Sequence, residues 1–126
     1  MPSEKKIFIV DDNEMLSMAL EDYLTRRIGH EVATFTTGEE CLEQIADMPD
    51  VVVLDYNLDS EDKNAKNGAQ ILADIKAFNA AIKVVMLSSK DAHGTSLQTL
   101  AGDADFHVFK SEEAFEEIAT IVNSLP

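Results

Sequence analysis

The 126-residue chain lacks long apolar runs, which limits its relation to membranes. A membrane-spanning helix needs roughly 20 consecutive apolar residues, and no run in this sequence approaches that length. The N-terminal segment MPSEKK leads into the short apolar run 7–10, which is too brief and too close to charges for a secretory signal. We therefore expect a protein that stays in the cytoplasm and does not enter a membrane.

Cysteine and basic residues are also scarce. Cys41 is the only cysteine, so no disulfide can form within the chain, which suits a reducing compartment. Only 10 Lys and Arg stand against 24 Asp and Glu, for a net charge of −14. Because nucleic-acid surfaces depend on neutralising phosphates, we expect no direct binding to DNA or RNA. No glycine-rich phosphate loop is present either, so the expected partners are proteins or small ions.

Short apolar runs alternate with segments whose apolar residues recur three and four positions apart. This alternation is typical of a βαβ series, and near-continuous Val, Ile, Leu and Met favour parallel strands covered on both faces. We predict a doubly wound α/β fold with a five-stranded parallel sheet in the order 2-1-3-4-5 and five helices, in one domain over 1–126 with no output domain visible. The predicted strands are 7–10, 31–35, 51–55, 83–88 and 106–109, and the apolar stripes of the helices lie within 16–24, 42–46, 71–78, 97–101 and 115–122.

Local signals predict where three of these helices begin. Two are capping boxes, in which a Thr side chain and a Glu or Gln three residues later satisfy free backbone N–H groups. The third is a Ser before two acids, typical of an N-cap followed by an acidic first turn. The residues are Thr37 with Glu40, Thr95 with Gln98, and Ser111 before Glu112 and Glu113.

Polar residues follow four of the predicted strands where each strand ends. Asp11 and Asp12 end the first, Asp55 the third, Ser88 the fourth and Lys110 the fifth. In an open parallel sheet these ends meet at one edge, where sites form. Neighbouring strands lie about 4.8 Å apart, so Asp12 and Asp55 should come close together, with Lys110 within reach and Ser88 between them.

Such a group of carboxylates repels itself, since each pair about 5 Å apart costs about 3 kcal/mol at an effective dielectric near 20. A cation must relieve this repulsion. Hard oxygen ligands without His or Cys favour Mg²⁺ over zinc, and Lys110 supplies a second positive charge. The sequence therefore predicts a magnesium site at this edge.

The segments IVDDNE, VVVLDYNL, VVMLSSKD and AGDADFHVFK, in this order, resemble the receiver domain of two-component response regulators. The resemblance covers almost the whole chain. It implies that Asp55 accepts a phosphoryl group from a histidine kinase or phosphotransfer protein, and that the domain then switches its contacts with a downstream protein. It also implies roles for the other residues: Mg²⁺ held by Asp12, Asp55 and the carbonyl of Asn57, and by Asp11 through water, with Ser88 as switch hydroxyl and Lys110 as phosphate partner.

The sequence departs from the family pattern in several places. His107 stands where receivers usually carry an aromatic residue, often Tyr, and Ser111 replaces the usual Pro after the Lys, so we expect a trans Lys110–Ser111 bond. The loop 56–67 is longer than usual and has Asp59 in place of a Pro. Lys90 lies where family side chains border the path of water to the phosphate.

Two other functions remain open at this point. One is a receiver-like interaction module that is never phosphorylated. The other is a Mg²⁺-dependent phosphatase, although such enzymes of the haloacid-dehalogenase type need a second Asp two residues after the nucleophile, where this chain has Asn57. In the favoured interpretation the chain is not an enzyme, beyond catalysing its own phosphorylation and dephosphorylation.

Overall fold

The computed structural model describes residues 4–56, 58, 67–88 and 104–125, and its centre is a parallel five-stranded sheet. The strand order is β2-β1-β3-β4-β5, and every neighbouring pair is parallel. The predicted fold class and strand order are confirmed. The strands are β1 (Lys6–Val10), β2 (Glu31–Phe35), β3 (Val51–Asp55), β4 (Lys83–Ser88) and β5 (Phe106–Phe109).

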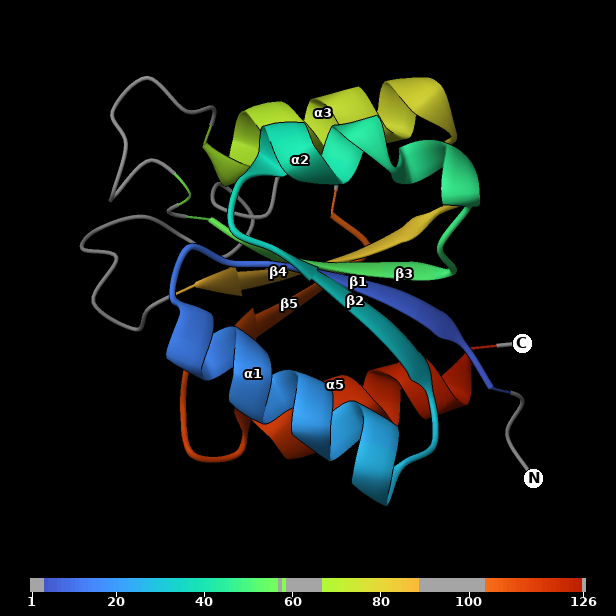
Figure 1. Cartoon of the computed structure of the whole chain (residues 1–126). Coiled ribbons are helices and arrows are strands. Elements are labelled where there is room, and N and C mark those ends of the chain that lie inside the picture. The colour runs from blue at the N-terminus through green and yellow to red at the C-terminus, as the bar shows by residue number, and fades with distance from the viewer. Residues whose placement is uncertain (1–3, 57, 59–66, 89–103, 126) are drawn as a thin grey trace.

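Helices cover both faces of the sheet (Figure 1), with α2 and α3 on one side and α1 and α5 on the other. The α1 helix continues as a π-helix over Tyr23–Arg27, and a 3₁₀ turn, Ile45–Asp47, follows α2. None of the described helices has the length and apolar character needed to cross a membrane. The helix predicted around 97–101 and the capping box at Thr95 lie outside the described residues. The helices are α1 (Glu14–Asp22), α2 (Gly38–Glu43), α3 (Gly68–Phe78) and α5 (Ala114–Ser124).

Two apolar cores result from the alternation of side chains along each strand. Successive residues of a strand point to opposite faces, so β1 sends Ile7 and Ile9 toward α1 and α5, and Phe8 and Val10 toward α2 and α3. All five residues of β3 are buried, as expected for a central strand covered on both sides. The buried thiol of Cys41 belongs to the core under α2 and α3.

Side chains cap three of the helices. The Thr37–Glu40 capping box at α2 is confirmed, and Asn67 with Gln70 forms a second box at α3. Asn13 caps α1, its side chain accepting from Leu16 N–H. The sequence patterns did not single out Asn13 or Asn67, although Asn is a favoured capping residue.

The prediction that Ser111 caps the last helix is wrong. The residues after Lys110 form a turn in which Ala114 N–H donates to the Ser111 carbonyl over 3.1 Å. This turn delays α5, whose N-cap is Glu113, with no side-chain capping bond. The first acids after Ser111 therefore lie in the turn before the helix.

His30, just before β2, forms hydrogen bonds that link the starts of β1 and β2 to α5, at the edge opposite the strand carboxyl ends. Lys5 N–H, just before β1, donates to Nδ1 over 2.9 Å, and Nε2 lies 2.9 Å from Asn123 Oδ1 in α5. The side chain is buried at the start of β2. Because Nδ1 accepts, the ring proton is on Nε2 and donates to Asn123.

Candidate functional site

Three carboxylates converge where β1 and β3 end. Asp11, Asp12 and Asp55 each offer an oxygen atom, and these oxygens all lie within 4.8 Å of one another. The two strands are neighbours and pair Val10 with Leu54, so their next residues emerge at the same edge. Asp11 and Asp55 are each only 1% exposed, whereas Asp12 is partly exposed. The structure thus brings together the three acids that the sequence singled out.

Lys110 brings a positive charge to this cluster from the end of β5. Its Nζ lies 3.1 Å from Asp55 Oδ1 and 3.6 Å from Asp11 Oδ2. The side chain reaches across β4, and its backbone N–H donates to the Ser88 carbonyl over 2.8 Å. One ammonium therefore links the ends of β5, β3 and β1.

Asp11 has a pKa raised to about 6. Burial is the main cause, because it disfavours the charged form, and the negative charge of Asp55 adds to it. A hydrogen bond of 2.8 Å from Asn13 N–H to Oδ1 and the charge of Lys110 act in the opposite direction. Asp11 Oδ2 is buried and forms no hydrogen bond with the described residues, and its charged neighbour is the Lys110 ammonium at 3.6 Å.

The donor set fits a small hard cation. The described groups around it are carboxylate oxygens and one ammonium, with no sulfur or imidazole ligand in the cluster of acids. Mg²⁺ prefers oxygen ligands and usually keeps several waters, so two or three carboxylates at one edge are sufficient. Asn57, the fourth expected ligand, lies outside the described residues.

Ser88 ends β4 between the acid cluster and β5, and it is 1% exposed. Its Oγ lies 2.9 Å from His107 Nε2 on the neighbouring strand. Burial lowers the pKa of His107. The sequence singled out both residues but did not pair them, because the contact depends on the register of β4 and β5.

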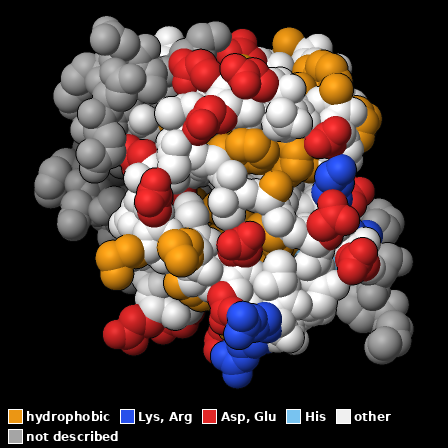
Figure 2. Space-filling model, in the orientation of Figure 1, with side chains coloured by type: hydrophobic (Ala, Val, Ile, Leu, Met, Phe, Trp, Pro, Cys, Tyr) orange, Lys and Arg blue, Asp and Glu red, His pale blue; other side chains and the backbone are white. Residues whose placement is uncertain are grey.

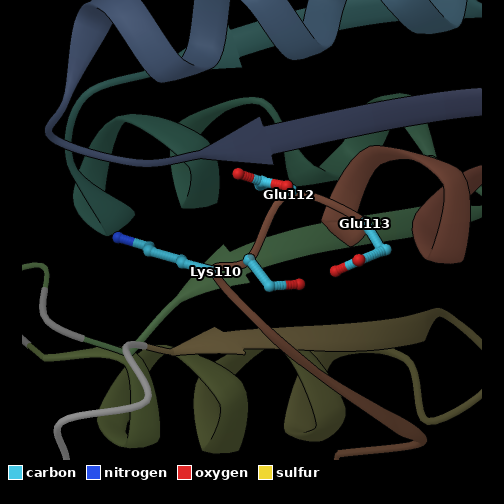
Figure 3. Close-up of a pocket in the computed structure, with 4 residues that line it drawn as sticks. Lys110, Glu112 and Glu113 are labelled. Atoms are coloured by element: carbon cyan, nitrogen blue, oxygen red, sulfur yellow. The ribbon is translucent and has the colours of Figure 1, made fainter.

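A pocket of about 650 Å³ lies beside Lys110 and is lined by Lys110, Ser111, Glu112 and Glu113. Figure 3 shows the Lys110 side chain extending away from the turn that carries the two glutamates. No cis peptide bond occurs among the described residues, so the predicted trans bond between Lys110 and Ser111 is confirmed. Lys90 and most of the loop 56–67 lie outside the described part of the chain.

Gly68 is a supporting residue that the sequence patterns did not reveal. It begins α3, and its N–H donates to the Tyr56 carbonyl over 2.9 Å. A Cβ at this position would lie 2.6 Å from the Asp55 carbonyl oxygen and 2.7 Å from Tyr56 Cα. Only glycine therefore lets α3 begin this close to the residue that ends β3.

Comparisons with known proteins agree with this architecture. Residues 7–123 match the family model of the response regulator receiver domain. The chain is 31% identical over 107 residues to the alkaline phosphatase synthesis transcriptional regulatory protein PhoP of Bacillus subtilis, a match that covers 84% of this chain and 42% of PhoP. It is 29% identical over 107 residues to the chemotaxis protein CheY of Thermotoga maritima, covering 82% of this chain and 84% of CheY.

Solved structures show the same fold. The BeF3-activated DrrB receiver domain superposes with a TM-score of 0.77 at 27% identity, covering 95% of each chain. The receiver domain of NtrX from Brucella abortus gives a TM-score of 0.78 at 24% identity, covering 95% of this chain and 99% of that one. The converging acids, the lysine that reaches them and the match over 7–123 together assign the chain to the response regulator receiver domain family of two-component systems.

Proposed function

We propose that this domain accepts a phosphoryl group on Asp55 from a histidine kinase or a phosphotransfer protein, in a reaction that requires Mg²⁺. The observation that carries the proposal is the position of the Asp55 carboxylate. It is buried at the end of β3, its Oδ1 lies 3.1 Å from Lys110 Nζ, and it belongs to a cluster of three acids. A nucleophile beside a positive charge, with acids that can hold a metal ion, is what phosphoryl transfer needs, because the protein mainly positions groups and neutralises the transferring oxygens.

In the proposed reaction a carboxylate oxygen of Asp55 attacks phosphorus and forms a new P–O bond. The bond from phosphorus to the donor's nitrogen or oxygen breaks, and its electron pair leaves with the donor. Lys110 stabilises negative charge on the phosphoryl oxygens. Asp11, Asp12 and Asp55 would hold Mg²⁺, which supplies further neutralisation when bound. Later attack of water on phosphorus releases inorganic phosphate and restores the carboxylate.

Phosphorylation changes the charge of the edge and adds strong acceptor oxygens to it. Lys110 contacts Asp55, and Ser88 ends the neighbouring strand β4, so we propose that both engage the new group and that contacts with a partner protein change as a result. The chain spans 42% of the length of PhoP and 84% of that of CheY.

The test is intact mass after incubation with acetyl phosphate, with and without Mg²⁺, for the wild type and for Asp55→Asn. We expect one added phosphoryl group in the wild type with Mg²⁺, and none in Asp55→Asn or in the presence of a chelator. Asn keeps the size of Asp and removes the nucleophilic charge.

An unmodified wild type, with both acetyl phosphate and a phosphorylated histidine donor, would support an interaction module that is never phosphorylated. Repeated turnover of a small phosphate ester would support a phosphatase.

A further inference from the structure

The hydrogen bond between Ser88 and His107 joins two side chains on the same face of the sheet. Met86 pairs with His107, and Ser88 pairs with Phe109, so these four residues alternate with Leu87 and Val108, which face the core under α1 and α5. Ser88 and His107 are therefore diagonal neighbours, and their side chains meet over 2.9 Å. The ring of Phe109 packs edge-on against that of His107, with centroids 5.2 Å apart. The imidazole is held from two sides.

The two ring nitrogens of His107 have different surroundings. Nε2 contacts Ser88 Oγ, whereas Nδ1 is buried and has no hydrogen-bond partner among the described residues. His30 provides a contrast in the same molecule, because both of its ring nitrogens have partners. Burial also lowers the pKa of His107, which favours the neutral ring with a single N–H.

The nitrogen that carries the ring hydrogen decides whether the Ser88 hydroxyl donates to His107 or accepts from it. If the proton were on Nδ1, a buried N–H donor would have no acceptor, and Ser88 would donate its only hydrogen to Nε2. If the proton is on Nε2, the unpaired atom is a bare nitrogen lone pair, and Ser88 Oγ accepts. Orphaned buried N–H groups are rarer than under-satisfied acceptors, so the second arrangement is favoured.

We propose that His107 is a positioning residue for Ser88: its Nε2–H donates to Ser88 Oγ and so leaves the only hydroxyl hydrogen of the serine for a phosphoryl oxygen on Asp55. This inference rests on the proposed function, since it needs a phosphoryl acceptor at Asp55. Ser88 follows Leu87, the residue of β4 that pairs with Asp55, so it lies at the same carboxyl edge of the sheet, one residue beyond Asp55. His107 does not touch the reacting atoms and acts through the direction in which Ser88 donates.

The first measurement is the tautomer of His107, from nitrogen NMR of the full chain with labelled histidine. We expect the proton on Nε2 and a bare Nδ1, with signals assigned by comparison with His107→Phe. A proton on Nδ1 would overturn this inference and leave the proposed function untouched. The result is independent of phosphorylation.

The second measurement is the affinity for beryllofluoride, a phosphoryl mimic, in the presence of Mg²⁺. His107→Phe keeps a ring against Phe109 but removes the donor, and we expect it to weaken binding about 2- to 10-fold, the range that one net hydrogen bond supports. His107→Gln can place an amide N–H near the position of Nε2, and we expect it to bind within about twofold of the wild type. In a Ser88→Ala background, His107→Phe should have no further effect.

Unchanged affinity in His107→Phe would overturn the inference, as would an equal loss in the Ser88→Ala background, which would indicate a packing effect. Thermal unfolding of each variant checks that the fold is retained, and His107→Gln preserves the test if His107→Phe does not fold. Absence of beryllofluoride binding in the wild type would instead remove the proposed function, and this inference with it.

Discussion

At the scale of single residues, Asp11 is the acid of the cluster whose pKa is clearly shifted. Its pKa rises from 3.8 to about 6, chiefly through burial. Between these two values the folded chain binds a proton that the unfolded chain releases. The stabilising contribution of protonated Asp11 is therefore complete below about pH 3.8 and is lost as pH rises through about 6.

This shift predicts that the pH dependence of stability differs without and with metal. In a chelator, the contribution of Asp11 to the free energy of unfolding should decrease as pH rises toward about 6. With saturating Mg²⁺ this dependence should weaken or reverse, because metal binding requires the carboxylate. Urea denaturation at a series of pH values measures both. Asp11→Asn, which carries no titrating group, is the matched control, and an identical pH dependence in wild type and control would contradict the prediction.

The acids and Lys110 could be predicted to meet because strand ends need only topology to be placed. The pairing of Ser88 with His107 could not, since it depends on strand register and on a rotamer. His30 was also missed. Its two hydrogen bonds reach residues 25 and 93 positions away in the chain, and no local pattern signals such contacts.

At the scale of elements, the start of α3 packs directly against the backbone at the end of β3. Gly68→Ala would place a methyl group against the backbone of Asp55 and Tyr56. Backbone atoms cannot rotate aside as a side chain can, so we expect a loss of about 1–3 kcal/mol in unfolding free energy. We also expect slower labelling by acetyl phosphate, because Asp55 would be displaced. Urea denaturation and timed intact mass measure the two effects.

Gly38→Ala is the matched comparison for this prediction. Gly38 begins α2, and its added methyl group would meet the side chain of Ile71 in α3. This clash involves a side chain and not the backbone of Asp55 and Tyr56, so stability should fall while the labelling rate stays close to that of the wild type. Equal labelling rates in the two variants would show that Gly68 does not hold Asp55 in the position needed for labelling.

Strands were easier to predict than helix ends. β1, β3 and β4 are short apolar runs bounded by polar residues, and their burial on both faces leaves little choice of conformation. Helix ends depend on which of several adjacent polar groups binds the free N–H groups, and Ser111 was misassigned because a turn intervenes. The π-helix after α1 was not predicted either. It ends at Arg27 with Ile28 as C-cap, and Gly29 follows with φ of 90°, a conformation that favours glycine.

At the scale of the whole molecule, excess negative charge works against the compact state. The net charge is −14, and acidic side chains are spread over the face shown in Figure 2, where Lys and Arg are few. Like charges held on one surface repel each other, which lowers stability while keeping the protein soluble. The composition alone predicts this effect, whereas the placement of Lys110 against two of the acids needed the fold.

Screening should therefore stabilise the fold. Raising the ionic strength from about 0.01 M to about 0.15 M shortens the Debye length from about 30 Å to about 8 Å, and we expect the free energy of unfolding to rise. The measurement is urea denaturation in NaCl with a chelator present. Glu43→Gln with Asp47→Asn removes two exposed acids and should gain less from salt. A wild type that is unaffected or destabilised by salt would contradict the prediction.

The burial of Cys41 has a consequence for how copies of this chain can meet. The sulfur is fully covered beneath α2 and α3, and burial raises its pKa to about 12. Thiol–disulfide exchange requires an accessible thiolate, which the closed molecule does not present near neutral pH. Covalent dimers through this position therefore require molecules in which α2, which carries Cys41, has moved away from the core, so oxidative crosslinking would select opened molecules and spare closed ones.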